Sequence, residues 1–339
     1  MKVEKKINIG LAILKIYLSF LVVTSHLYSP NDKIRNYIII KIIRNQNHVP
    51  IYYIMSFYFC YHLFKLKNIR KIKIRFQRLL IPYFVWPIII WLLNNLLSFL
   101  YTKINKISFT DLILQLLTGH IFMIVLWFQY NLIFITLMIF IIHFLFNEKL
   151  IFYILINLKI FGLFFTYSNY NFIFFSQYNF DIKYTFGRFF EVIVFCITGY
   201  LFASLNLANI LSKNRIISIN IFLSILILNI KYTIFLEIEG FNYQGFKLYF
   251  SSISIFFLFY LIPKKIIKNK YIIKYIEYIS NHTVGIYFIH LQIYYYLNIF
   301  SLFNNLTLSG AIIIYFMSYF ISLCGKLIFR KTKLINLFQ

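Results

Sequence analysis

The sequence predicts an all-α protein in which about ten transmembrane helices form one polytopic bundle over residues 1–339. Two observations support this prediction. Hydrophobic residues make up 61% of the chain and charged residues only 13%, an apolar content far above that of soluble proteins. The apolar residues also form separate runs near the ~20 residues that a helix needs to cross the ~30 Å hydrocarbon core of a bilayer. Because no Gly-, Ser- or Pro-rich linker and no repeat interrupts these runs, we expect a single integral membrane domain.

Ten such runs are candidate spans. The first run follows a basic segment, MKVEKK, as the apolar region of a signal peptide does. The run is nevertheless too long for a signal peptide, contains Lys15 and lacks a cleavage site of small residues. It is therefore counted as a span. The ten runs cover approximately residues 8–28, 49–66, 79–100, 121–146, 150–167, 188–205, 216–236, 245–262, 279–300 and 309–329.

Basic loops predict the orientation, because the cytoplasmic loops of membrane proteins carry an excess of Lys and Arg. If the N-terminus is cytoplasmic, most positive charge falls inside, and the even number of spans returns the C-terminus to the same side. The expected location is therefore the inner (plasma) membrane, with both termini cytoplasmic. The connection over residues 29–48 does not fit, since it places four basic residues outside, and it could instead lie along the membrane surface. The inside segments are residues 1–6, 65–78, 212–215, 263–274 and 330–333.

The formal charge of +25 does not indicate binding of nucleic acid. The basic residues lie in short clusters between apolar runs and not on a folded polar face. Cys60, Cys196 and Cys324 each fall inside an apolar run without metal-type spacing. We therefore predict free thiols, with no disulfide and no metal site.

Two ionisable residues lie within the first span, where charge is costly. Lys15 and His26 are eleven residues apart, which on an α-helix corresponds to three turns plus about 20° and a rise of about 16 Å. Both side chains therefore share one helix face, with Lys15 toward the cytoplasm and His26 beyond the midplane. Either they line a channel through the bundle, or Lys15 extends to the membrane surface and His26 forms a hydrogen bond near the outer interface.

A pair of arginines lies at the cytoplasmic entry to the third span, in RFQRLLIPYFVW (75–86). Arg75 and Arg78 are three positions apart, so their guanidinium groups can converge on one anion, and Arg is well suited to binding phosphate. The same two residues belong to a cluster of seven Lys and Arg between residues 65 and 78. That cluster can equally serve as a topology anchor.

Six segments, taken in order, resemble the acyltransferase 3 family, whose members are multi-span bacterial enzymes that O-acylate carbohydrates and lipids. The first span resembles the family's opening helix, which carries a basic residue, here Lys15 where Arg is commoner, and a histidine eleven positions on, here His26. The segment RFQRLLIP resembles the family's Arg-x-x-Arg motif and the Leu-Ile-Pro that follows it. The other similar segments are HVPIYYIMSFYF (48–59), LWFQYNLI (126–133), RFFEVIVFCITGYLFA (188–203) and SNHTVGIYFIH (280–290).

This resemblance implies a membrane O-acyltransferase, with acetyl favoured as the commoner acyl group. Acyl-CoA, here acetyl-CoA, would be the donor substrate on the cytoplasmic side, with no permanently bound cofactor, and Arg75, Arg78 and Lys15 would hold its phosphates. His26 would be the general base that takes a proton from an acceptor hydroxyl. The expected partners are membrane lipids, a carbohydrate or glycolipid acceptor outside the cytoplasm, and other enzymes of cell-surface polysaccharides.

One departure from the family lies in the second span. Phe57 follows Ser56 where the family usually has Gly, and its ring would prevent a close backbone approach that Gly allows. We expect either a shifted neighbouring helix or a reshaped donor pocket there. Ser56 and Tyr58 remain substrate-binding candidates.

Further substrate-binding candidates lie in the later spans. Trp127 and Gln129 are placed along the acceptor route, with ordinary packing as the alternative for Trp127. Arg188 and Glu191 are three positions apart and, in the alternative that we favour, neutralise each other. His290 either faces the same cavity or is a hydrogen-bonded packing residue.

A second function class is a polysaccharide polymerase or a flippase for lipid-linked sugars, which needs cationic residues for a pyrophosphate but no thioester site. Such proteins are expected to carry their decisive Arg residues in large outer loops or along a central cavity. Here the arginine pair lies at the cytoplasmic face and the outer loops are short. This placement favours the acyltransferase.

We predict that reporter enzymes fused within residues 65–78 will report a cytoplasmic location, because only that arrangement places most basic segments on one side. Alkaline phosphatase and green fluorescent protein fusions at the same positions measure this from both sides of the membrane. An active phosphatase at residues 65–78 would overturn the predicted orientation.

Overall fold

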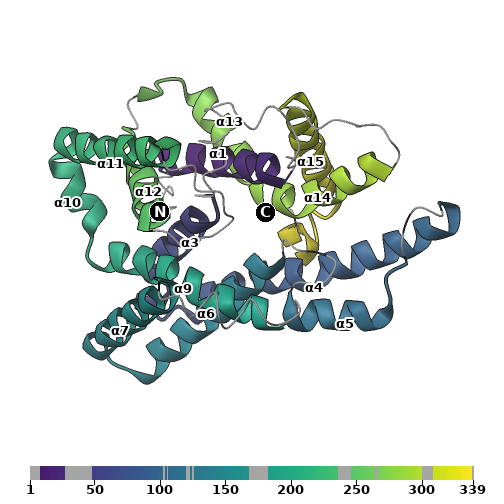
Figure 1. Ribbon diagram of the computed structural model, residues 1–339, viewed down its shortest axis with the longest axis horizontal. Helices are drawn as coiled ribbons and strands as arrows, with labels where there is room; N and C mark the ends of the chain where they lie inside the picture. Colours follow the sequence, from purple (N-terminus) through teal and green to yellow (C-terminus); the bar gives the residue numbers. More distant parts are fainter. Residues whose placement is uncertain are drawn as a thin grey trace.

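The computed structural model describes residues 8–26, 48–101, 104, 106–119, 123, 126–167, 182–235, 246–263, 266–299 and 308–337. Every regular element in these residues is a helix, which confirms the predicted fold class, and the helices pack into one bundle (Figure 1). In chain order they are α1 (Ile9–His26), α3 (His48–Lys65), α4 (Ile69–Leu100), α5 (Phe109–Thr118), α6 (Leu126–Leu145), α7 (Glu148–Tyr167), α9 (Ile182–Ser204), α10 (Leu207–Lys213), α11 (Arg215–Phe235), α12 (Phe246–Tyr260), α13 (Lys270–Ser280), α14 (Thr283–Ile299), α15 (Leu308–Ile328) and the short 3-10 helix η3 (Lys333–Leu337).

Each of the ten predicted spans coincides with a helix, namely α1, α3, α4, α6, α7, α9, α11, α12, α14 and α15. Among the described helices, three are both long and apolar enough to cross a membrane: Ile69–Leu100, Leu126–Leu145 and Gly310–Ile328. A fourth crossing results if Arg188–Ser204 and Leu207–Lys213, which are bent by 62° relative to each other, form one broken span. Others are short: α12 has 15 residues and α14 has 17, about 22–26 Å of helix against a core of ~30 Å. The apolar helices agree with a membrane protein, and the number of about ten spans stays a prediction.

The helix that contains the third predicted span, residues 79–100, begins ten residues earlier, because α4 starts at Ile69. The side chain of Asn68 caps this helix by accepting a hydrogen bond at 3.0 Å from a backbone N–H of the first turn. In the turns that follow, Ile72 is buried and most basic side chains are exposed, while Ile69 and Ile74 are exposed as well. Most of the basic segment 65–78 therefore forms the first turns of α4.

Two short amphipathic helices, α5 and α13, are not predicted. Each begins after a residue whose side chain caps the backbone N–H groups of the first turn. For α5 this residue is Ser108, which forms a reciprocal capping box with Asp111, and the helix ends at Gly119 with a φ of +72°, a left-handed conformation that favours glycine. For α13 the cap is Asn269, whose side-chain oxygen accepts a hydrogen bond from the Tyr271 N–H at 2.8 Å. Both caps are visible in the sequence and are the signals that locate these helices.

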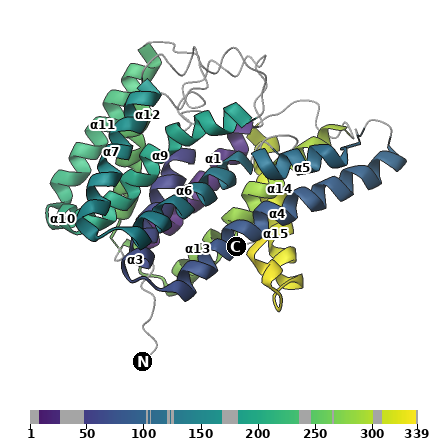
Figure 2. The same cartoon turned by 90° about the horizontal axis from the view of Figure 1, so that it is seen from below.

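Helices α1 and α3 lie at the centre of the bundle. α1 packs against α3, α12, α13, α14 and α15, and α3 packs against α4, α6, α9 and α12. Two glycines allow helix backbones to approach closely here. A Cβ on Gly10 of α1 would lie 1.7 Å from the Phe259 carbonyl oxygen of α12, and one on Gly199 of α9 would lie 2.0 Å from the Ile54 carbonyl oxygen of α3. Around this centre, α10 and α11 lie at one end of the molecule, and α4 and α5 extend together at the other (Figures 1 and 2).

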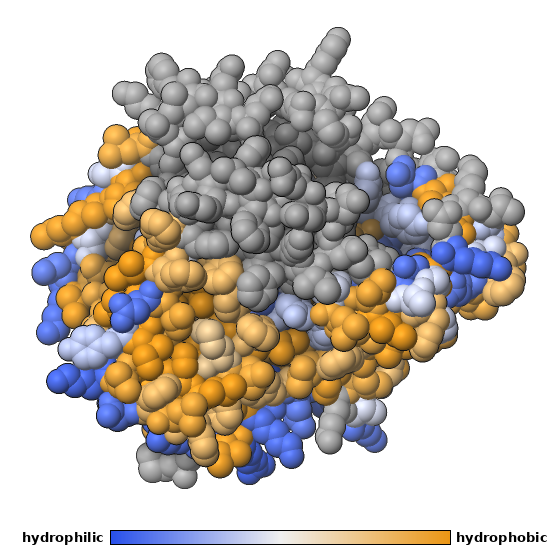
Figure 3. Space-filling model, turned by 60° about the horizontal axis from the view of Figure 1, so that its bottom comes forward, coloured by the Kyte–Doolittle hydropathy of each residue, from blue (hydrophilic) through white to orange (hydrophobic). Residues whose placement is uncertain are grey.

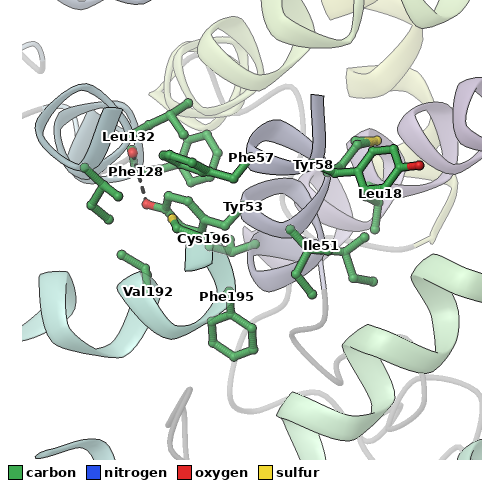
Figure 4. Close-up of a cluster of buried hydrophobic side chains, with 14 of the residues drawn as sticks. Leu18, Ile51, Tyr53, Phe57, Tyr58, Phe128, Leu132, Val192, Phe195 and Cys196 are labelled. Atoms are coloured by element: carbon green, nitrogen blue, oxygen red, sulfur yellow. Dashed lines mark hydrogen bonds between the residues drawn. The ribbon is translucent and has the colours of Figure 1, made fainter. Parts of the chain in front are cut away.

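The side chains of α3 extend in two directions (Figure 4). Tyr53 and Phe57 point toward Phe128 of α6, and the Tyr53 hydroxyl donates a hydrogen bond to the Phe128 carbonyl oxygen at 3.0 Å. Tyr58 lies on the other side of the helix, beside Leu18 of α1. All five residues are buried, so α3 joins α1 to α6 through its side chains.

Large apolar side chains are exposed on the outer helices. Figure 3 shows them as a broad surface with hydrophilic side chains gathered along its lower edge. Lipid covers a surface of this kind in a bilayer, whereas water would not favour it. Examples are Leu96 and Phe99 of α4, Ile216 of α11, and Phe316 and Phe320 of α15.

We expect Gly199→Ala to destabilise the protein by about 1–3 kcal/mol, the usual range for overpacking a tight contact. The new Cβ would meet the backbone of Ile54, which cannot rotate away. Gly162→Ala is the comparison, because its Cβ would meet side-chain methyl groups of Val194 at 2.9 Å and Ile193 at 3.0 Å and no backbone atom closer than 3.4 Å. Thermal unfolding of the detergent-purified variants measures both effects. An equal loss of stability in the two variants would contradict the special role of the α3–α9 backbone contact.

Candidate functional site

Arg75 of α4 points into the bundle and joins three helices. Its Nη2 atom donates hydrogen bonds to Ser56 Oγ of α3 at 2.9 Å and to Thr136 Oγ1 of α6 at 3.4 Å. The guanidinium also lies 5.6 Å from the centre of the Phe57 ring, a cation–π distance. Its Nε atom is buried and has no hydrogen-bond partner in the part of the chain that the structure describes. Arg75 is therefore an internal cation that keeps one donor for a ligand.

Phe57 forms an aromatic wall beside this cation. Its side chain is completely buried and points toward α6 (Figure 4). A glycine at position 57 would allow another helix backbone to approach α3 closely. In this structure such an approach occurs at Ile54 of α3, where Gly199 of α9 lies against the backbone. A ligand that reaches the Arg75 guanidinium would thus meet the Phe57 ring next to it.

Arg78 has a different environment although it lies only three positions along α4. Its side chain is exposed, whereas that of Arg75 is half-buried. The predicted convergence of the two guanidinium groups on one anion therefore requires a ligand that extends from the exposed surface of α4 inward to Arg75.

Three predicted residues meet between α6 and α9. Arg188 Nη1 donates to Glu191 Oε2 at 2.7 Å, so the ion pair that their spacing predicts is present. The Arg188 guanidinium carbon also lies 5.8 Å from the centre of the Trp127 ring. Glu191 and Trp127 are each 6% exposed, and a carboxylate this buried needs a cation beside it. Mutual neutralisation of charge thus explains why Arg188 and Glu191 are paired. The pair also lies beside the Trp127 ring.

A chain of aromatic rings connects α3 to His290 of α14. The Phe128 ring lies 6.2 Å from the Tyr52 ring and 5.2 Å from the Tyr287 ring, and Tyr287 lies 6.2 Å from the imidazole of His290. His290 is fully buried, and its Nδ1 lies 3.1 Å from the carbonyl oxygen one turn earlier in α14, which agrees with the packing alternative. Lys15 lies beside the same chain, because the Tyr52 hydroxyl donates to the Lys15 carbonyl oxygen at 3.1 Å.

Tyr58 and Gln129 make contacts that hold helices together. The Tyr58 ring lies 5.4 Å from the Phe256 ring and 5.6 Å from the Tyr260 ring of α12. The buried Gln129 side chain donates from Nε2 to the Leu79 carbonyl oxygen at 2.9 Å. Tyr58 therefore joins α3 to α12, and Gln129 joins α6 to α4.

His26 is the last residue of α1, and its side chain lies outside the described residues, as do residues 27–47. The helix is continuous from Ile9 through both Lys15 and His26, which is the geometry that their predicted common face requires. The role of His26 as a base stays a prediction.

Two polar residues of α6 near this region are not predicted. Thr136 is fully buried and accepts a hydrogen bond from Arg75. His143 is hydrogen-bonded to the Tyr200 hydroxyl of α9 and stacks on the Phe64 ring of α3 at 5.5 Å. The two residues are seven positions apart and therefore share one helix face. Polar residues at this spacing in an otherwise apolar run are the signal that identifies them.

The candidate site thus offers cationic groups and aromatic walls suited to an anionic organic ligand. Cys60 and Cys196 are free and buried, and Cys324 is free and half-buried. Within the described residues, no group of three His, Cys, Asp or Glu side chains is arranged to hold a metal ion.

Comparison with known proteins gives one match. A family model described as an acyltransferase domain matches residues 8–330, which includes every described helix from α1 to α15. A search of curated proteins and a search of solved structures find no match.

We expect Arg75→Ala to lower the free energy of unfolding by about 1–3 kcal/mol, because it removes a buried donor from Ser56 and Thr136. Arg78→Ala is the matched control on the same helix and should change stability by no more than about 0.5 kcal/mol, since its side chain is exposed. Arg75→Lys should recover part of the loss, because an ammonium group lacks the planar fork of Arg. Thermal unfolding in detergent measures all three, and equal stability of the two alanine variants would deny the internal hydrogen bonds any stabilising role.

Proposed function

The chain belongs to the acyltransferase 3 family over residues 8–330 and is therefore a membrane acyltransferase, and we propose that it O-acetylates a carbohydrate or glycolipid. In this proposal the acetyl group comes from cytoplasmic acetyl-CoA and is received by a hydroxyl outside the cytoplasm or on a lipid-linked sugar. The family match carries the proposal. Acetyl is chosen because it is the commoner acyl group of the family.

The donor phosphates are proposed to bind at the first turns of α4. Arg78, Lys71 and Lys73 are exposed there, and such a cluster of positive charge attracts an anion from solution. Arg75 is the inner cation of the same helix and keeps a buried Nε donor. Charge-assisted hydrogen bonds to phosphate are about twice as strong as neutral ones, which suits a site that must hold a highly charged donor. Lys15 of α1 is proposed as a further contact.

The acyl transfer itself is proposed to use His26 as general base. The imidazole takes the proton from the acceptor hydroxyl while the hydroxyl oxygen forms a bond to the thioester carbonyl carbon. The carbon–sulfur bond then breaks, the acetyl group stays on the acceptor oxygen, and the coenzyme A thiolate leaves with the proton that the imidazolium returns. An imidazole can gain and lose a proton near pH 7, so the neutral ring is suited to the first step and the imidazolium to the second.

The acceptor is proposed to pass the group formed by Trp127, Arg188 and Glu191. An aromatic face can stack on the apolar face of a sugar, and the neighbouring ion pair supplies a hydrogen-bond donor and an acceptor for hydroxyls. Ser56, Tyr58, Gln129 and His290 are retained as weaker candidates, because each already makes a contact that holds helices together or a bond within its own helix. The proposed location is the plasma membrane with both termini cytoplasmic, in association with enzymes that build surface polysaccharides.

We expect His26→Gln to insert and to bind labelled acetyl-CoA normally, and to acylate roughly 10²–10⁴-fold more slowly, the usual contribution of a positioned base. The measurements are binding of labelled acetyl-CoA to protein in detergent, and labelled acetyl recovered from the glycan and lipid extracts of membranes that contain each variant. His62→Gln is the matched control, because His62 is an exposed imidazole on α3.

Two outcomes would contradict the proposal. Near-normal specific activity of His26→Gln would remove this residue from the chemistry and leave His290 as the next imidazole to test. No binding of acetyl-CoA and no labelled product with the unaltered protein would reject acetyl as the transferred group and leave another acyl donor to be tested.

A further inference from the structure

His282 is a buried imidazole at the junction of α13, α14 and α15, and the proposed function assigns no role to it. It directly precedes Thr283, the first residue of α14, and its side chain is 0% exposed. The ring lies 5.0 Å from the Tyr278 ring of α13 and 5.5 Å from the Tyr319 ring of α15. Its environment is therefore an aromatic cage built by two helices.

Only one of the two ring nitrogens has a partner. Nδ1 lies 3.4 Å from Ser322 Oγ of α15. Nε2 is buried and has no hydrogen-bond partner within the described residues. A buried polar atom without a partner costs free energy, and a ligand that bonds to it would remove this cost.

One cation lies near this imidazole, and one carboxylate, Glu277, directly precedes Tyr278 on α13. Lys326 follows Ser322 by four positions and therefore shares its face of α15; its Nζ lies 5.8 Å from the centre of the Tyr278 ring. It acts electrostatically on His282 and makes no ion pair with any carboxylate in the described part of the chain. The N-terminus of α14 adds the positive end of a helix dipole here, and the C-terminus of α13, two residues before His282, adds the negative end of another.

The α13 side of the cage reaches the surface of the protein. Tyr278 is 42% exposed, and Lys270, Lys274, Tyr271 and Tyr275 of the same helix are exposed too. An amphipathic helix that carries Tyr and Lys in this way is typical of the water–membrane interface. Phosphate groups are the anions found at that interface.

We propose that His282, Lys326 and the N-terminus of α14 form a binding site for a phosphate group. When the Ser322 hydroxyl donates to Nδ1 and not to the His282 carbonyl oxygen, Nε2 carries the ring proton. Nε2 and the Lys326 ammonium then supply two hydrogen-bond donors, and the rings of Tyr278 and Tyr319 form the walls. This inference needs no acyl transfer and is separate from the proposed donor site at Arg75 and Arg78. The same phosphate chemistry is carried by an anionic phospholipid headgroup and by a soluble phosphorylated nucleotide, and the experiment separates these two sources.

The experiment measures both sources with the purified full-length protein in phospholipid-free detergent. In one arm, native mass spectrometry counts bound phosphatidylglycerol, with zwitterionic phosphatidylcholine for comparison. In the other arm, calorimetry measures binding of adenosine 3′,5′-bisphosphate. We expect saturable binding in at least one arm, and the arm in which Lys326→Met weakens that binding identifies the source.

Lys326→Met and His282→Phe should each weaken that binding roughly 10- to 100-fold, the range for losing a hydrogen bond to a charged group. His282→Phe keeps a ring between Tyr278 and Tyr319, and His282→Gln should restore part of the affinity because it returns an N–H donor. Lys331→Met is the matched control, since it removes an equal charge from an exposed position close to Lys326 in sequence. Thermal unfolding of each variant shows that it is folded, and Lys326→Met by itself decides the question if His282→Phe does not fold.

Three outcomes would overturn the proposal. They are no saturable binding in either arm, unchanged affinity of folded Lys326→Met, and an equal loss of affinity in Lys331→Met, which would reduce the effect to general surface charge.

Discussion

The close contact between α3 and α9 is the constraint on which the rest of the candidate site depends. Gly199 has no side chain where α9 meets the backbone of Ile54, so the two helices approach without a layer of side chains between them. With α3 held in this position, Ser56 lies within hydrogen-bonding distance of Arg75. With α9 held there as well, Arg188 lies over the Trp127 ring of α6. Each group of candidate residues therefore includes side chains from one of these two closely packed helices.

Within this apolar bundle, the need to pair buried polar groups explains most of the internal hydrogen bonds. Neither lipid nor packed hydrocarbon can replace a missing partner, and accordingly Gln129 donates to a carbonyl oxygen of α4 and Glu191 accepts from Arg188. Arg75 Nε and His282 Nε2 are exceptions among the described residues. Arg75 lies among basic side chains and His282 near Lys326, and an unpaired buried donor costs about 1–3 kcal/mol. An anionic ligand would recover this free energy at either position.

One basic segment that predicts the orientation of the chain, 65–78, contains Arg75, and Lys326 lies four positions before another, 330–333. The first turns of α4 carry Arg75 among exposed Lys and Arg, and the end of α15 carries Lys326. η3, which follows α15, packs against α4, so the two basic regions belong to neighbouring elements. Positive charge that orients a membrane protein can thus also serve to bind anions. Reporter fusions test the first role, and ligand-binding measurements test the second.

The sequence by itself determined the helical class, the positions of the ten helices that coincide with apolar runs, and the Arg188–Glu191 pair. These features are local: run length decides whether a helix can lie in a bilayer, and residues three positions apart on a helix are neighbours in any fold. The start of α4 and the helices α5 and α13 were missed although their caps at Asn68, Ser108 and Asn269 are local as well, because apolar run length does not detect a short amphipathic helix.

Only the tertiary structure decided which distant residues meet. Arg75 is 19 positions from Ser56 and 61 from Thr136, and nothing in their spacing indicates that α4 turns this arginine inward while Arg78 stays exposed. The contact of Gly199 with Ile54 and the cage around His282 are equally nonlocal. The physical reason is that such contacts depend on which helices pack together and at what distance, and the apolar periodicity of one helix does not specify the neighbour against which its face is buried.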